Sequence, residues 1–373
     1  MIAITNCKFF KGEQLITDAS ILIDKGLIKE ITTAALTSGY EVINAGGNYI
    51  TPGFIDLQIY GSGGDLFSAY PTAETLKQMD ADLISKGTTG FLACVATNTM
   101  EIFHQAIVAA KAYRPYAKSF LGLHLEGPYL NPKRLGAHPE EYVHKATLEE
   151  VKGLLEAADG VIKMMTIAHE LQDDEVIQYL LDQGVVLSLG HSDANFEQAN
   201  TAFSQGFTTS THLFNAMPSI HHRNPNLPVA IFNHPSAMAS IIADGAHVDF
   251  EMVKMSYNLM KDRLFLITDA VTACAIGPYQ HQLSGTRYVT PEGTISGSNI
   301  TLLDAVRNCM QYCNIPLSAA LKMASAHPAR VIKKADQLGE LAPGKAANLL
   351  LFSDELVLRK VFIEGVEHFS SIN

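Results

Sequence analysis

The sequence predicts an α/β protein, in which a TIM-like (β/α)8 barrel is joined to a small β-sandwich domain formed from both chain termini. Eight short apolar segments recur along the middle of the 373-residue chain, and each leads into a polar or glycine-rich stretch and then a helical pattern. Near-continuous apolar strands that alternate with helices are typical of a parallel sheet covered on both faces. The two ends of the chain carry short strand patterns separated by turn residues instead.

The barrel is assigned to residues 51–340. In chain order, its candidate strands are YITPGFIDLQIY, TTGFLACV, SFLGLHLEG, VIKMMTIAHE, VVLSLGHSD, TTSTHLFN, ASIIADGAH and RLFLITDA. The helices between them have readable ends: Thr147 to Glu150 form a capping-box pattern, and DDEVIQYLLDQG runs from acidic residues to Gly184. Eight such units favour a closed barrel, although other α/β folds share the spacing.

The small domain is assigned to residues 1–50 and 341–373. Its segments include ASILIDKGLIKEI near the start of the chain and ANLLLFSDELVLRKVFIEGVEHF near the end. Two β-rich ends that flank a barrel are expected to pair with each other.

Composition excludes several classes of protein. The formal charge of −11 argues against a nucleic-acid binder, because no basic stripe is available to neutralise phosphates. The five cysteines are odd in number and form no CxxC pair, which fits a reducing compartment. No signal-peptide pattern and no apolar run of membrane-spanning length is read. We therefore expect a cytoplasmic protein without a membrane partner.

Titratable side chains gather where the candidate strands end. Catalytic groups of a barrel collect at the C-terminal ends of its strands, so these side chains are expected to converge on one cavity. A lone histidine is more often a core or rim residue, but polar groups at equivalent positions of successive strands are hard to explain separately. They are His124, Glu126, His169, Glu170, His191, Asp193, His212, Asn215, Asp244, His247 and Asp269.

Glu126, His191 and His212 make a plausible metal set. Two imidazoles and a carboxylate leave a fourth position open for water, as in catalytic zinc sites. Such a metal lowers the pKa of its water from about 16 to about 7. Asp269, which closes the eighth strand in FLITDA, suits a general base that later acts as an acid.

Two loop residues have open interpretations. Arg223 lies in a loop bounded by prolines and is either a solvated arginine or an anion clamp, because a guanidinium binds phosphate in a fork. His138 ends NPKRLGAH and either polarises a substrate carbonyl or has no catalytic part.

These strand ends resemble the amidohydrolase superfamily and, more narrowly, its N-acetylglucosamine-6-phosphate deacetylase family. The matching segments are TPGFIDLQIYGSGG, LGLHLEGPYLNPKRLGAH, SLGHSDA, STHLFNAM, ADGAHVD, LITDA and SGSNITLLDAVRN, in the family's order. Late in the chain, GELAPGKAANLLLF is similar to a strand-returning segment of the superfamily, with Asn348 at its usual aspartate.

The resemblance implies a function and a set of roles. The implied reaction is metal-dependent hydrolysis of N-acetyl-D-glucosamine 6-phosphate to D-glucosamine 6-phosphate and acetate, in amino-sugar catabolism. Glu126, His191 and His212 become ligands of one divalent metal per subunit, with zinc expected and iron, cobalt or manganese as alternatives. Asp269 becomes the base, and His138 polarises the acetyl carbonyl. The family also implies a homodimer.

The resemblance also implies contacts with the phosphosugar. Arg223 and His247 would hold the phosphate, and Asn215 and Ala216 would contact the sugar through their backbone. The implied binding set is completed by Ala137, His138, Ile295, Ser296 and Gly297. His124 resembles no ligand of the family and is assigned a supporting place.

Several alternatives stay open. The substrate could be the galactosamine epimer, a non-phosphorylated sugar or a cyclic amide. A sugar-phosphate isomerase would not need the metal set. A catalytically dead scaffold would be expected to have lost the ligands, and all are present.

The first strand ends in Gln58 and Tyr60, where most of the superfamily has His-x-His and a second metal position. A neutral amide is a poor ligand, and a phenol with a pKa near 10 must first deprotonate. We therefore predict a vestigial second-metal position. Tyr60 departs even from the Gln-x-Asn of some deacetylases, so its role is undefined by the resemblance.

Overall fold

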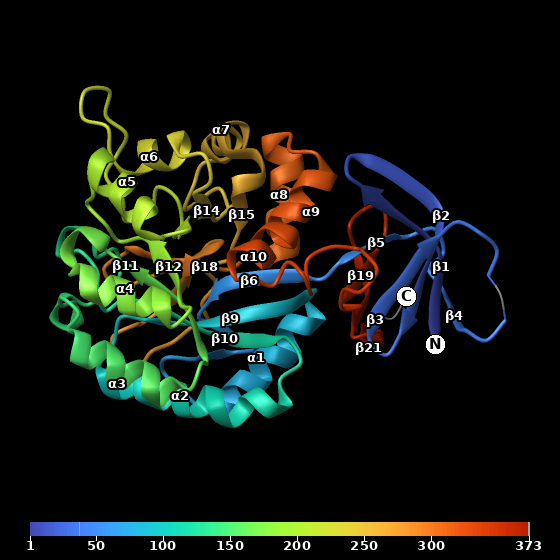
Figure 1. Ribbon diagram of the computed structural model, residues 1–373, viewed down its shortest axis with the longest axis horizontal. Helices are drawn as coiled ribbons and strands as arrows, with labels where there is room; N and C mark the ends of the chain where they lie inside the picture. Colours follow the sequence, from blue (N-terminus) through green and yellow to red (C-terminus); the bar gives the residue numbers. More distant parts are fainter. Residues whose placement is uncertain (37, 372–373) are drawn as a thin grey trace.

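The computed structural model describes residues 1–36 and 38–371. A β/α barrel lies beside a β-sheet unit, and strands from the beginning and the end of the chain come together in that unit (Figure 1). The predicted fold class is confirmed. No helix among the described residues has both the length and the apolar character needed to cross a bilayer.

The barrel is formed by strands in strict chain order. Each neighbouring pair is parallel. The 8-stranded sheet consists of β6 (Phe54–Ile59), β9 (Thr88–Ala96), β10 (Phe120–Glu126), β11 (Ile162–Ile167), β12 (Val186–Leu189), β13 (Thr209–Ser210), β14 (Met238–Ile241) and β15 (Leu264–Leu266). A parallel bridge between Ile59 and Ala270 closes the ring.

Helices cover the outside of the barrel. Thr147 accepts a hydrogen bond from the backbone N–H of Glu150 and starts one of them where the sequence predicts. The helices are α1 (Ala73–Ser85), α2 (Met100–Tyr113), α3 (Leu148–Ala158), α4 (Asp174–Asp182), α5 (Phe196–Gln205), α6 (Leu227–Asn233), α7 (Phe250–Met260), α8 (Leu302–Cys313), α9 (Leu317–Ala324) and α10 (Ala326–Val331).

The terminal sheet joins the two ends of the chain. Its strands follow the order β21-β20-β19-β5-β1-β2-β3, and β4 pairs with β1. Those from the start are β1 (Ile2–Lys11), β2 (Gln14–Asp24), β3 (Leu27–Thr32), β4 (Glu41–Asn44) and β5 (Tyr49–Pro52), and those from the end are β19 (Leu349–Phe352), β20 (Leu358–Ile363) and β21 (Val366–Ser370). Ile4, Ile21, Ile50, Leu349 and Phe362 share one apolar core.

The two ends meet where β5 pairs antiparallel with β19, with Thr51 opposite Leu350. β5 crosses the boundary expected between residues 50 and 51, because it completes the terminal sheet and leads directly into the barrel. The division of the chain at residues 50 and 340 stays a prediction.

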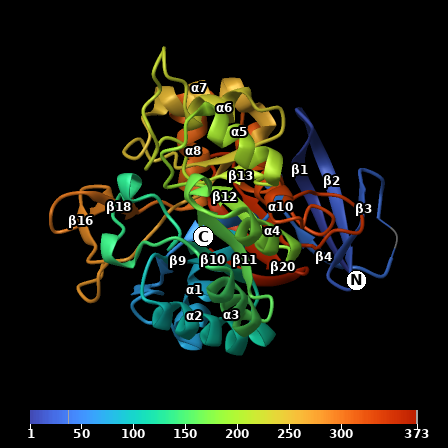
Figure 2. The same cartoon turned by 60° about the vertical axis from the view of Figure 1, so that its left-hand side comes forward.

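Within residues 1–36 and 38–371, two small sheets lie outside the barrel. β7 (Gly61–Ser62) and β8 (Asp65–Leu66) pair in the glycine-rich loop after β6. Residues 271–300, which we call the cap segment, contain a three-stranded antiparallel sheet of β16 (Gln282–Ser284), β17 (Arg287–Val289) and β18 (Ile295–Ser298). Figure 2 shows this segment in orange, projecting at the left of the barrel.

A buried aspartate fastens the first barrel strand to the last. Asp56 on β6 is fully buried, and its Oδ1 accepts hydrogen bonds from the N–H groups of Gln58 (3.2 Å) and Thr268 (3.3 Å). Its Oδ2 accepts one from Thr268 Oγ1 (2.5 Å). Burial raises the pKa of Asp56 to about 7. This side chain therefore joins β6 to the segment after β15, which we call the barrel seam. Gln58 and Asp269 both lie beside this seam.

We predict that Asp56→Ala lowers the free energy of unfolding by about 3 kcal/mol or more, because three buried donors lose their acceptor. Urea unfolding followed by circular dichroism measures the loss. Asp56→Asn is the matched control, since its amide oxygen keeps two of the bonds and its NH2 donates to Thr268. An equal effect of both substitutions would contradict the role given to the carboxylate.

Candidate active site

The strand ends surround a cavity of about 150 Å3. The sequence-predicted residues that line it are Tyr60, Glu126, Ala137, His138, His191, His212, Asn215, Ala216, His247, Asp269, Ile295, Ser296 and Gly297. Most of them come from the C-terminal ends of the strands, where a barrel places catalytic groups. Strand ends far apart in the sequence therefore do converge on one space.

Three site residues adopt a left-handed backbone conformation two or three positions after the ends of their strands. The φ angles are 47° at His191, 32° at His212 and 54° at Asp269. Such angles are uncommon for residues with a Cβ and persist where the surrounding structure enforces them, often at functional sites. Here the sharp turn at each strand end places the side chain at the cavity.

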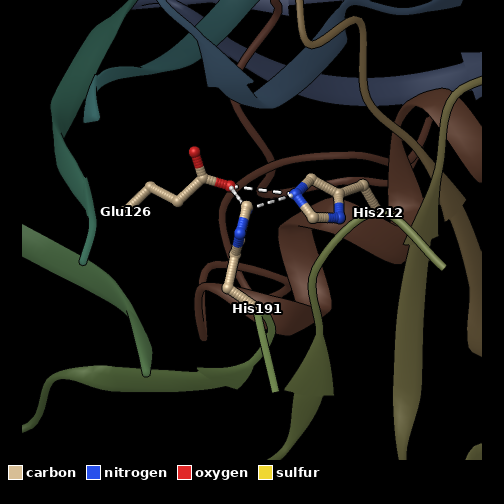
Figure 3. A group of neighbouring side chains, drawn as sticks. All are labelled: Glu126, His191 and His212. Atoms are coloured by element: carbon tan, nitrogen blue, oxygen red, sulfur yellow. Dashed lines mark hydrogen bonds and ion pairs between the residues drawn. The ribbon is translucent and has the colours of Figure 1, made fainter. Parts of the chain in front are cut away.

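Glu126, His191 and His212 point toward one another (Figure 3). Glu126 Oε1 lies 3.0 Å from His212 Nε2 and 3.3 Å from His191 Nε2, and the two Nε2 atoms are 3.1 Å apart. The three potential ligand atoms all lie within 4.8 Å of one another, and all three residues are buried. Two imidazole nitrogens and a carboxylate oxygen at one point are a donor set suited to a divalent metal.

The protonation states of His191 and Glu126 also fit a metal. His191 donates its Nδ1–H to the carbonyl of Arg134 (2.8 Å), which leaves the Nε2 lone pair directed at the cluster. Burial lowers the pKa of His191 to about 4. Burial alone would raise the pKa of Glu126, but His138 and His191 hold it well below its usual range. A neutral imidazole and an ionised carboxylate are the forms that bind metals.

Gln58 and Tyr60 occupy the other side of the Glu126 carboxylate. Tyr60 donates its hydroxyl to Glu126 Oε2 at 2.5 Å. Gln58 Nε2 lies 2.9 Å from Glu126 Oε1, 2.9 Å from Asp269 Oδ1 and 2.7 Å from the Tyr60 hydroxyl. The N–H groups of Gln58 thus lie between the carboxylates of Glu126 and Asp269, at a place where a second cation would otherwise be expected. This arrangement supports the predicted vestigial position.

Asp269 sits beside the cluster. Its Oδ1 is held by Gln58, and its Oδ2 lies 4.0 Å from His247 Nε2. The His247 ring is fixed in turn by Asp244, whose Oδ2 accepts a hydrogen bond from Nδ1 (2.7 Å). Asp244 Oδ1 also accepts the backbone N–H of His247 (2.8 Å). Asp244 therefore directs His247 Nε2 toward the cavity.

His138 comes from the loop after β10. Its Nε2–H donates to Glu126 Oε2 (3.0 Å), and its ring centroid lies 4.4 Å from that of His191. Its Nδ1 faces the Tyr279 hydroxyl at 3.4 Å. The ring is held beside the metal set, although it does not belong to the set.

Comparison with known proteins adds a family to this geometry. A sequence model of the amidohydrolase family matches residues 49–367.

The chain belongs to the amidohydrolase family.

Relatives within this family are similar over nearly the whole chain. The N-acetylglucosamine-6-phosphate deacetylase of Haemophilus influenzae is 33% identical over 374 residues, which cover 97% of this chain and 98% of that one. The human enzyme of the same name is 30% identical, covering 98% of this chain and 95% of its own.

Solved structures agree. The N-acetylglucosamine-6-phosphate deacetylase of Pasteurella multocida gives a TM-score of 0.94 at 29% identity, covering 99% of this chain and 100% of that one. A mutant of the Mycobacterium smegmatis deacetylase in complex with N-acetyl-D-glucosamine-6-phosphate gives 0.92 at 28% identity and covers 99% of each chain. Amidohydrolases are metal-dependent, and this amidohydrolase has a possible metal site in Glu126, His191 and His212.

Not all sequence-predicted residues line the cavity of this amidohydrolase: Gln58, His124, His169, Glu170, Asp193, Arg223 and Asp244 lie outside its wall. Glu170 instead accepts hydrogen bonds from Ser192 Oγ and from the backbone N–H of Asp193. His124 is fully buried beneath the site, where its Nδ1–H donates to the carbonyl of Leu57 (2.9 Å) and its Nε2 pairs with Thr166 Oγ1 (2.8 Å). Arg223 is exposed, bonds to His222 Nε2 (2.9 Å) and does not line the cavity. The anion-clamp role of Arg223 stays a prediction that its position in this chain does not support.

Sequence reasoning missed Tyr279 and His281, which line the cavity from the cap segment. Neither follows a barrel strand, so the strand-end pattern could not find them. The histidine within GPYQHQLSG was the one sequence feature that could have indicated a site residue in this segment. Asp244 was noted at its strand end, but its contact with His247 depends on a turn that spacing does not reveal.

We predict that this amidohydrolase binds one metal ion per chain and that Tyr60→Phe weakens binding about 10-fold, because Glu126 loses a donor that orients it. Competition with a chromophoric chelator measures the affinity, and elemental analysis measures the stoichiometry. Tyr279→Phe is the matched control, since that hydroxyl donates to the carbonyl of Thr97 (2.7 Å) rather than to a ligand. Unchanged affinity in Tyr60→Phe, or two metals per wild-type chain, would show the interpretation to be wrong.

Proposed function

We propose that the chain hydrolyses N-acetyl-D-glucosamine 6-phosphate to D-glucosamine 6-phosphate and acetate. The observation that carries the proposal is the convergence of Glu126, His191 and His212 on one point, with Asp269 in the same cavity. The near full-length similarity to deacetylases of that name supports the substrate. We also propose that the protein acts in the cytoplasm, which agrees with its five free cysteines.

The metal set would hold the ion that acts as a Lewis acid in the reaction. Glu126, His191 and His212 would hold a divalent ion, which when bound would lower the pKa of a water from about 16 to about 7 and polarise a carbonyl. The donor set accepts zinc, iron, cobalt or manganese, and zinc is the proposed ion.

Asp269 is the proposed base and acid. Gln58 holds its Oδ1, so Oδ2 is the oxygen left to take a proton from the attacking water. The same atom then delivers this proton to the amine as the C–N bond breaks. The fixed position of the side chain means that both transfers use one geometry.

His138 is the proposed donor to the acetyl oxygen. Its Nε2–H is directed at Glu126 Oε2 in the free protein. A carbonyl oxygen that developed negative charge at this place would compete for that hydrogen bond, which becomes stronger as the charge grows. Tyr279, on the other side of the ring, limits its rotation.

The sugar would lie under β18 and against the loop after β13. Ile295, Ser296 and Gly297 line one part of the cavity, and Asn215 and Ala216 line another. Asn215 already donates its N–H to the carbonyl of His212 (2.9 Å), so a backbone contact with the sugar would use other atoms.

His247 is the proposed contact for the phosphate. Asp244 fixes its ring and leaves Nε2 at the cavity. We further propose a homodimer, which light scattering of the purified protein would test.

Acetate release tests the function. We predict release from N-acetylglucosamine 6-phosphate by the metal-loaded protein and a kcat/KM lower by about 100-fold or more with the unphosphorylated sugar, because His247 would lose a charged partner. An enzymatic acetate assay measures both. N-acetylgalactosamine 6-phosphate is run in parallel to test the epimer. Absence of acetate with metal bound would overturn the proposal.

For Asp269→Asn we predict unchanged metal content and a fall in kcat of roughly 10²–10⁴-fold, because the amide cannot accept the proton. Elemental analysis and the acetate assay are done on the same preparation. Asp262→Asn, a substitution of an exposed carboxylate near α10, is the matched control and should keep wild-type turnover. Retained activity in Asp269→Asn would mean that another group is the base.

A further inference from the structure

The cap segment contributes to the cavity a histidine to which neither the family resemblance nor the proposed mechanism gives a role. His281 lines the cavity together with Tyr279, from the same segment, and Ser296 on β18. It is buried, with 4% of its surface exposed. A buried polar side chain at the wall of a binding cavity needs a partner, because an unpaired polar group there costs free energy.

The His281 ring is held in place from several sides. Its backbone N–H donates to the carbonyl of Cys274 (2.9 Å), and its carbonyl accepts from the N–H of Cys274 (3.1 Å). Nδ1 pairs with Ser296 Oγ at 2.8 Å. The ring stacks on Tyr279 at 6.1 Å between centroids and meets Tyr288 edge-on at 6.5 Å. Its orientation is therefore set before any ligand arrives.

The other ring nitrogen has no such restraint. Among the described residues, Ser296 is the one hydrogen-bond partner of the imidazole, and it takes Nδ1. Nε2 has no hydrogen-bond partner among the described residues, and it is not closed off from solvent. Because Nε2 is unpartnered and open to solvent on a side chain that lines the cavity, a molecule bound there can reach it.

The charge of the ring limits what that molecule can offer. Burial lowers the pKa of His281 to about 4, so the imidazole is neutral near pH 7. A neutral imidazole has one donor and one acceptor nitrogen, and the bond to Ser296 decides which of them Nε2 is. A hydroxyl group satisfies either case, because it both donates and accepts.

We propose that His281, positioned by Ser296, hydrogen-bonds a ring hydroxyl of the bound sugar and is a specificity-determining residue of the deacetylase reaction. This inference rests on the proposed function and adds to it a contact with a part of the sugar other than the reacting amide. The hydroxyl groups available on the sugar ring are those at C1, C3 and C4. If His281 had only a structural role, the Ser296 bond and the aromatic contacts would be sufficient, and Nε2 would have no partner in the complex.

The test combines His281→Phe with deoxy substrates. The phenyl ring keeps the aromatic contacts and removes Nε2, so we expect KM for N-acetylglucosamine 6-phosphate to rise about 3–10-fold, with kcat nearly unchanged. The 1-deoxy, 3-deoxy and 4-deoxy analogues are then assayed with both proteins. For one of them the ratio of wild-type to variant kcat/KM should fall to about 1, because the hydroxyl that His281 contacts is already missing.

Ser296→Ala is the second variant. It frees the ring without removing it, so the loss in kcat/KM should be smaller and should vanish for the same analogue. This variant also keeps the test informative if His281→Phe folds poorly, which thermal unfolding would reveal. An equal ratio for all three analogues, or wild-type kcat/KM in both variants, would overturn the inference.

The wild-type protein separates this inference from the proposed function. No turnover of the parent sugar phosphate by metal-loaded wild type would overturn the deacetylase function and the inference with it. Normal wild-type turnover with identical ratios across the analogues would overturn the role of His281 alone.

Discussion

The hydrogen bonds around the carboxylate of Glu126 connect all parts of the site. One oxygen faces His191, His212 and Gln58, and the other accepts from Tyr60 and His138. A buried carboxylate with this many donors stays ionised and keeps one orientation. Because these partners come from the ends of β6, β12 and β13 and from the loop after β10, the carboxylate fixes the mutual positions of four segments. Its own position depends on the barrel, since β10 ends at Glu126.

The barrel can place these groups only if it closes at the right register. Closure brings Gln58 on the first strand beside Asp269 after the last, and Asp56 secures that junction through Thr268. A shift of one residue along this seam would turn Gln58 and Tyr60 away from Glu126, because side chains alternate along a strand. Buried polar contacts thus serve both the closure of the fold and the arrangement of the acid and base groups.

The sequence predicted the functional residues that lie at the C-terminal ends of the barrel strands. Glu126, His191, His212 and Asp269 could be predicted together because parallel strands bring their C-terminal ends to one edge. The hydrogen bond of Tyr60 to Glu126 could not be predicted, because it joins residues on different strands whose register the sequence does not state. His281 and Tyr279 could not be predicted, because the cap segment has no repeating pattern that relates it to the barrel. Arg223 shows the opposite case, in which a residue suited to phosphate lies outside the cavity wall.

The pairing of β5 with β19 has a consequence for the order of events during synthesis. β5 leaves the ribosome long before β19, yet its edge is covered only when Leu350 reaches Thr51. Until then, the newly made chain exposes an unpaired strand edge, which is a template for association with other chains. A nascent chain stalled before β19 would therefore be a better substrate for chaperones than the finished protein, however complete its barrel.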